Sequence, residues 1–147
     1  MLGGILGAIL VYLHYYPHWE PTQDKGSKRA VFCTSPAIRH IPSNFFSEFM
    51  GTFVLLVGLS ALGANRFAEG LNPLVVGALV LAIGLSLGGT TGYAINPARD
   101  LGPRIAHAIL PIPGKGGSDW GYSWIPVLAP ILGGAAGAIT YRMLFPL

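Results

Sequence analysis

The run Asn96-Pro97-Ala98-Arg99-Asp100 combines residue types that suit the first turn of a helix and the recognition of a small polar molecule. Asn96 is a favoured N-cap and Pro97 a favoured first helical residue, because proline lacks the N–H that would be left without a partner there. An asparagine cap accepts a backbone N–H through its carbonyl oxygen, while its NH₂ can still donate elsewhere. The positive end of the helix dipole faces the same place and repels cations. Asn-Pro-Ala alone suits an ordinary capped helix start equally well.

The two charges that follow carry more information than the cap. Charges in a membrane-embedded segment are expensive and tend to face a partner or a water-filled path. Arg99 can offer its guanidinium fork to hydroxyl oxygens and so hold an alcohol or water in a narrow constriction. The alternative is an arginine that snorkels to the lipid headgroups. Asp100 does not face the same direction and is expected to brace neighbouring backbone N–H groups.

Glu48 is an isolated charge one turn into a long apolar segment. A carboxylate at that depth can accept hydrogen bonds from N–H groups near Gly88–Tyr93, and so hold the carbonyl groups of residues 88–95 toward a pore. The alternative is a carboxylate that snorkels out at the helix end.

The other reactive residues form no recognisable centre. Cys33 is the single cysteine, so an intrachain disulfide is excluded and the thiol has no partner for a metal site. The four histidines are scattered without ligand spacing, and the glycine-rich stretch 113–118 lacks the spacing of a phosphate-binding loop. Since there is no nucleophile–base set, we expect neither an enzyme nor a cofactor or metal.

Composition places the chain in the membrane class. Only 10% of the 147 residues are charged and 52% are hydrophobic, whereas roughly 25% are charged in an average soluble domain. Nine basic and six acidic residues give a net charge of +3 without a dense basic run, so no nucleic-acid surface is indicated.

The apolar stretches predict a single all-α membrane domain covering residues 1–147. Transmembrane helices are expected over 44–64, 73–92 and 123–145, because about twenty residues cross a hydrocarbon core of about 30 Å. Residues 1–16 would reach only about 24 Å and are expected to be part of a longer helix. Residues 17–43 are expected to be a polar loop, and the short helix 97–110 a re-entrant half-helix, which must line a cavity or be buried in protein. Its irregular entry would be Gly88–Gly92.

The stretch from Thr91 to Pro103 resembles the second signature loop of the major intrinsic proteins, the aquaporin family. An aspartate directly after the arginine, here Asp100, resembles the motif of the glycerol-facilitator branch rather than that of the water-selective branch. The resemblance therefore implies an aquaglyceroporin. It implies an aquaporin-like helix bundle, here the second inverted repeat with part of the preceding helix. It also implies a pore with a narrow ring at Arg99, Gly84 and Tyr93, with further pore positions at Gly92, Ala94 and Asn96. Glu48, Pro97, Ala98 and Asp100 would support this ring.

Two of the ring positions bear on selectivity. Gly84 is small where water-selective members carry a histidine, which leaves room for a carbon backbone. Tyr93 replaces the phenylalanine frequent among glycerol facilitators and adds a hydroxyl to the apolar wall. The resemblance therefore implies passage of glycerol, other small uncharged solutes and water. The alternatives are a water-selective channel or a non-conducting membrane subunit.

The resemblance also implies a context for the chain. Family members carry a first, inverted half with its own Asn-Pro-Ala loop, and this chain is expected to lack that half of the pore wall. A homotetramer in the plasma membrane is implied for the full-length protein, with glycerol, water and lipid as its partners. Residues 17–43 would lie outside the cell, although Lys25, Lys28, Arg29 and Arg39 oppose the positive-inside tendency.

Overall fold

The computed structural model describes residues 1–146 and confirms an all-α fold, since no strand occurs in that range. The helices in chain order are α1 (Leu2–His14), the 3-10 helix η1 (Tyr16–His18), α2 (Lys25–Ala30), α3 (Ile41–Gly63), α4 (Asn72–Leu87), α5 (Pro97–Ile109) and α6 (Ile125–Leu144).

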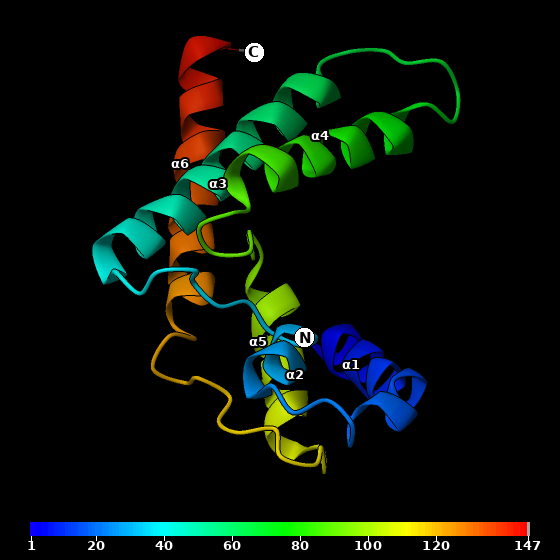
Figure 1. The fold of residues 1–147 in the computed structure, drawn as a ribbon. Coiled ribbons are helices and arrows are strands. Elements are labelled where there is room, and N and C mark those ends of the chain that lie inside the picture. The colour runs from blue at the N-terminus through cyan, green and yellow to red at the C-terminus, as the bar shows by residue number, and fades with distance from the viewer. Residues whose placement is uncertain (147) are drawn as a thin grey trace.

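The helices form two groups (Figure 1). In one group α3 packs against α6 and α4, and in the other α1 packs against α5. The segment after α2 reaches α5 through the Phe32 ring, whose centroid lies 5.5 Å from that of His107, and α5 also contacts α6. The half-helix α5 therefore joins the two groups, and the irregular residues 88–96 lead from α4 into it.

The crossing of α3 and α6 depends on two glycines one turn apart. A Cβ atom on Gly137 would lie 2.6 Å from the carbonyl oxygen of Phe53, and one on Gly133 would come closer still to the carbonyl oxygen of Phe49. The two backbones thus meet without a side chain between them, which small residues permit in membrane helices. This contact fixes where α3 lies, and α3 carries Glu48.

α4 is shorter than the sequence predicted. It ends at Leu87 rather than at residue 92, because two glycines follow, Gly88 and Gly89, and glycine is disfavoured within a helix. Two helices, Ile41–Gly63 and Ile125–Leu144, are long and apolar enough to cross a membrane, while α1 and α4 are shorter apolar helices. The residues after Leu87 instead form the irregular entry to α5.

Residues 17–43, predicted as a polar loop, are partly helical and fold against the rest of the chain. The Asp24 side chain caps α2 by accepting the backbone N–H of Ser27 at 2.6 Å. Lys28 is buried and its ammonium donates to the carbonyl oxygen of Pro113. Arg39 pairs with Asp119. Two cations of this segment therefore hold it against the stretch between α5 and α6.

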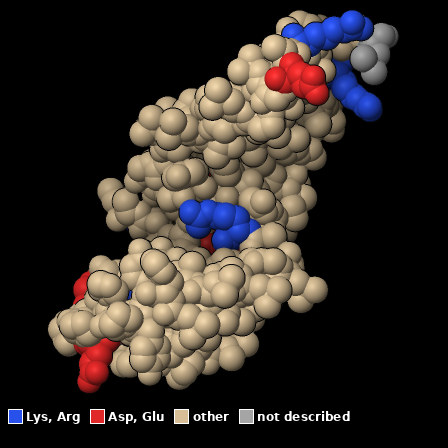
Figure 2. All heavy atoms as spheres, turned by 90° about the vertical axis from the view of Figure 1, so that its right-hand side faces the viewer, with Lys and Arg blue, Asp and Glu red and all other residues tan. Residues whose placement is uncertain are grey.

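Charge is distributed unevenly over the surface. Figure 2 shows a face with charged atoms at its two ends and at one place near the middle, and uncharged surface between them. Large apolar side chains are exposed on the helices, among them Leu6 and Leu10 on α1, Leu85 on α4 and Ile139 on α6. Such a surface is suited to contact with lipid rather than water.

Candidate pore site

Asn96 begins the half-helix in the manner expected of a cap. Its Oδ1 accepts the N–H of Ala98 at 2.9 Å and that of Arg99 at 3.4 Å. Pro97 occupies the first helical position. The side chain of Asn96 is exposed, and its Nδ2 is not used by the cap. It can therefore donate to a molecule that approaches the start of α5.

The entry segment, defined here as residues 88–95, has an unusual backbone. Gly92, Tyr93 and Ile95 have φ angles of 80°, 38° and 42°. Left-handed conformations are uncommon for residues with a side chain, and a bulky residue such as Ile95 adopts them only when its surroundings enforce them.

The Glu48 carboxylate holds this backbone in place through two hydrogen bonds. Its side chain is fully buried, with Oε1 accepting the N–H of Ala94 at 3.0 Å and Oε2 accepting that of Ile95 at 2.8 Å. The amides were expected at Gly88–Tyr93 and lie immediately after that stretch. Gly51, one turn further along α3, makes room for the Ile95 side chain, because a Cβ there would lie 2.9 Å from Ile95 Cγ2. The snorkelling alternative is wrong for this carboxylate.

Tyr93 and Gly84 lie together, and Gly88 lies with them. A Cβ on Gly84 would be 2.9 Å from Tyr93 Cζ, and one on Gly88 would be 2.7 Å from Tyr93 Cδ1. The tyrosine ring thus lies across a glycine surface formed by Gly84 near the end of α4 and Gly88 just after it. Gly84 has a role that the sequence did not reveal, since it accommodates this ring.

The remaining predicted pore positions differ in exposure. Arg99 is exposed, Gly92 is half-buried against Thr34, and Ala94 is buried. The Ala94 side chain therefore belongs to the interior, and this position contributes through its backbone. Arg99, Asn96 and Tyr93 are the predicted residues with exposed side chains.

Asp100 points away from Arg99 into the protein. It is fully buried, and its Oδ2 accepts the backbone N–H of Thr34 at 2.8 Å and the Thr34 hydroxyl at 2.7 Å. The expected brace of backbone N–H groups thus reaches a distant segment rather than neighbouring residues. Asp100 also forms a two-pronged pair with Arg104, with Nε to Oδ1 and Nη2 to Oδ2 both at 2.8 Å.

Arg104 was not predicted from the sequence as a residue of the site. The structure places its side chain fully buried. Its other hydrogen bonds go to the carbonyl oxygens of Thr34 at 2.9 Å, Ser118 at 2.7 Å and Asp119 at 3.2 Å. The available signal was an acidic residue followed four positions later by a basic one in the same short helix, a spacing that places both side chains on one face.

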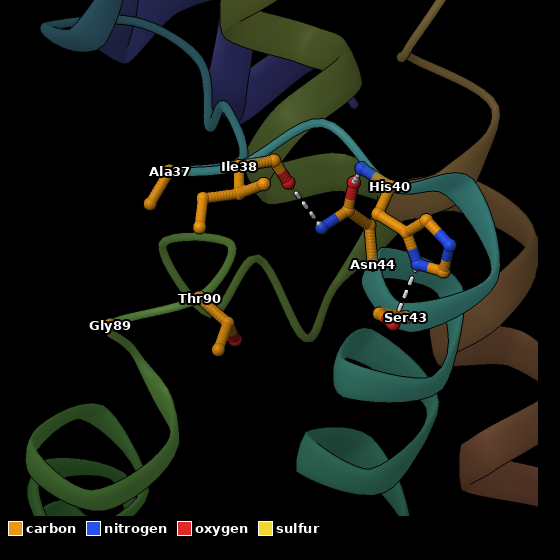
Figure 3. Close-up of a pocket in the computed structure, with 7 residues that line it drawn as sticks. All are labelled: Ala37, Ile38, His40, Ser43, Asn44, Gly89 and Thr90. Atoms are coloured by element: carbon orange, nitrogen blue, oxygen red, sulfur yellow. Dashed lines mark hydrogen bonds between the residues drawn. The ribbon is translucent and has the colours of Figure 1, made fainter.

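A cavity of about 370 Å³ lies beside the entry segment, and Figure 3 shows its lining. His40 Nδ1 is 2.8 Å from Ser43 Oγ, and Asn44 Nδ2 donates to the carbonyl oxygen of Ile38 at 3.0 Å. These polar groups are thus paired with one another. No predicted pore residue lines this cavity; it is lined by Ala37, Ile38, His40, Ser43, Asn44, Gly89 and Thr90.

The arrangement defines a class of protein: an apolar helix bundle with a short helix that starts inside it, capped by an exposed asparagine. The family model described as major intrinsic protein matches residues 1–141. The chain belongs to the major intrinsic protein family.

Similar proteins include the glycerol uptake facilitator protein of Bacillus subtilis (strain 168), which is 63% identical over 145 residues, covering 99% of this chain and 53% of that protein. The probable glycerol uptake facilitator protein of Thermotoga maritima is also 63% identical over 145 residues, covering 99% of this chain and 62% of that protein. The X-ray structure of the aquaglyceroporin from Plasmodium falciparum superposes with a TM-score of 0.78 at 29% identity, covering 99% of this chain and 61% of that one. The chain therefore spans little more than half the length of these proteins.

Proposed function

We propose that this chain forms one half of a passive transmembrane channel for glycerol, other small uncharged solutes and water. The observation that carries the proposal is the exposed pair Asn96 and Arg99 on the first turn of α5, which follows closely in the chain on the exposed Tyr93, whose ring packs against Gly84 and Gly88. Two donors next to an apolar ring match a polyol, which has hydroxyl groups on a hydrocarbon chain.

In the proposed mechanism each group has a separate task. Arg99 and the Nδ2 of Asn96 donate to hydroxyl oxygens, while the Tyr93 ring contacts the carbon backbone. The small Gly84 accommodates the Tyr93 ring and so sets how far that ring extends toward the path. The positive charge of Arg99 and the positive end of the α5 dipole both oppose the entry of cations.

The other half of the path is proposed to come from a second, inverted repeat. Support for this comes from the relatives, which are longer than this chain and are named as glycerol uptake facilitators. A homotetramer in the plasma membrane, embedded in lipid, is proposed for the complete protein. Exposed apolar side chains, among them Leu6 on α1, Leu85 on α4 and Ile139 on α6, are available for these contacts.

Stopped-flow measurements on vesicles containing a full-length channel with this chain as its second half test the proposal. We expect both glycerol and water permeability above the lipid background, and loss of both in Arg99→Ala. Water flux without glycerol flux would indicate a water-selective channel. Background flux for both solutes would indicate a non-conducting subunit.

A further inference from the structure

We propose that Arg104 and Thr34 are positioning residues that set the spacing between Arg99 and Tyr93, and thereby the selectivity of the pore. The inference rests on the proposed function, because it assigns selectivity to residues that do not face the path. It arises from hydrogen bonds that join α5 to Thr34 and to residues 118–119, and from the packing of Thr34 against Gly92 in the entry segment.

The buried pair of Asp100 and Arg104 fixes the orientation of α5. Asp100 and Arg104 are both fully buried and are joined by two parallel hydrogen bonds of 2.8 Å. A buried pair with this fork geometry cannot turn without exposing an uncompensated charge to the interior. Because Arg99 directly precedes Asp100 in the helix, the direction of the Arg99 side chain is tied to this pair.

Arg104 is anchored to two segments outside α5, at Thr34 and at residues 118–119. Its guanidinium donates to the carbonyl oxygen of Thr34, before α3, and to those of Ser118 and Asp119, before α6. Asp119 in turn pairs with Arg39. One side chain therefore holds α5 against two segments that are distant from it in sequence.

Thr34 connects Asp100 and Arg104 to the segment that carries Tyr93. Thr34 gives its N–H and its hydroxyl to Asp100, and its methyl group lies against Gly92, where an added Cβ would be 3.4 Å from Thr34 Cγ2. Gly92 has a φ of 80° and immediately precedes Tyr93. Thr34 is therefore wedged between the helix that carries Arg99 and the segment that carries Tyr93.

The test compares Thr34→Val with Thr52→Val. Each substitution keeps the branched shape and removes one buried hydroxyl hydrogen bond: Thr34 donates to Asp100 Oδ2 at 2.7 Å and Thr52 to the carbonyl oxygen of Glu48 at 2.9 Å. Thr52 lies near the α3–α6 contact, where its methyl would be 3.6 Å from a Cβ on Gly134. A purely structural loss should affect both variants similarly.

The variants are compared by amide hydrogen exchange and by the glycerol-to-water permeability ratio. Amide hydrogen exchange of the 147-residue chain in lipid nanodiscs should become severalfold faster over Gly92–Ile95 in Thr34→Val and stay near the unaltered rate in Thr52→Val. In a full-length channel with this chain as its second half, Thr34→Val should change the glycerol-to-water permeability ratio severalfold, and Thr52→Val should not.

Arg104→Lys is a second variant that keeps the buried charge but loses the planar fork. It should shift both readouts in the same direction as Thr34→Val. Unchanged exchange in Thr34→Val and Arg104→Lys would overturn the inference, and so would faster exchange with an unchanged permeability ratio. If the unaltered channel passes neither solute, the proposed function fails, and with it the assignment of selectivity, whereas the exchange result still decides the positioning.

Discussion

At the scale of single residues, Glu48 shows how a buried charge can be tolerated in an apolar bundle. Each of its two carboxylate oxygens accepts one backbone N–H from the entry segment. An ionised acceptor makes stronger hydrogen bonds than a neutral one, and it is needed here because Ile95 is in a left-handed conformation. The carboxylate therefore compensates for the strain of the residues just before Asn96.

Glu48→Gln should weaken this support, because an amide has only one acceptor oxygen and its NH₂ group would face an N–H donor. We expect a loss of about 1–3 kcal/mol in stability and reduced flux in the full-length channel. Membrane insertion should be retained, since removing a charge makes insertion easier. Thermal unfolding in detergent measures the loss. Glu20→Gln, at an exposed loop position, is the control, and equal effects in the two variants would contradict the role.

Gly84→Ala tests the fit between α4 and the tyrosine ring. A methyl group there would lie 2.9 Å from Tyr93 Cζ, whereas nothing lies within 4 Å of a Cβ on Gly77 in the same helix. We expect Gly84→Ala to displace the ring and lower glycerol permeability severalfold, with a smaller effect on water, because glycerol is the larger permeant. Gly77→Ala should leave both permeabilities close to the unaltered values. A glycerol permeability unchanged by Gly84→Ala would contradict this packing.

At the scale of elements, the α3–α6 crossing decides where Glu48 can reach. The two helices approach through backbone atoms at Gly133 and Gly137, where the nearest atoms of α3 are the carbonyl oxygens of Phe49 and Phe53. The packing of α3 against α6 thus fixes the position from which Glu48 reaches the entry segment.

Gly133→Ala and Gly134→Ala form a matched pair on adjacent positions of α6. The new methyl at Gly133 would clash with the carbonyl group of Phe49, while at Gly134 it would find side-chain atoms no nearer than 3.5 Å. We expect Gly133→Ala to destabilise the chain by about 1–3 kcal/mol, and Gly134→Ala to stay within about 0.5 kcal/mol of the unaltered protein. Thermal unfolding in the same detergent compares them. Equal stability would show that the helices can separate without cost.

At the scale of the whole molecule, two of the four Lys and Arg residues in the 17–43 segment take part in holding the fold together. Lys28 and Arg39 are engaged with Pro113 and Asp119. The positive-inside tendency is a bias in the number of Lys and Arg residues in short loops near the membrane, and it is not a rule for each residue. Their presence in this segment is therefore compatible with a location outside the cell.

This orientation can be tested with a cysteine introduced at the exposed position Gln23. The native Cys33 is buried, and burial raises the pKa of its thiol to about 11. Because the thiolate is the reactive form, Cys33 should react very little with a maleimide at pH 7. A membrane-impermeant maleimide added to intact cells should label Gln23→Cys and not the unaltered chain. Labelling of Gln23→Cys only after cell lysis would place the segment in the cytoplasm.

The 147-residue chain reconstituted alone should insert into vesicles and leave glycerol and water permeability at the lipid background. Asn96, Arg99 and Tyr93 are exposed in the described structure, so the chain by itself does not enclose a path around them. Copies inserted in one orientation present the same half twice and do not supply the inverted one. Flux above background that is lost in Arg99→Ala would contradict this expectation.

The sequence by itself determined the helical class, the apolar segments and the start of the half-helix at Asn96, because these depend on local composition and on capping chemistry. It placed Glu48 near the entry segment but missed the amides by one or two residues, since a backbone in the left-handed region has no periodicity to extrapolate. Only the tertiary structure revealed Arg104 as the partner of Asp100 and Thr34, and Gly84 as the surface under Tyr93. These contacts join residues many positions apart, and they depend on how closely the helices approach, which no local pattern encodes.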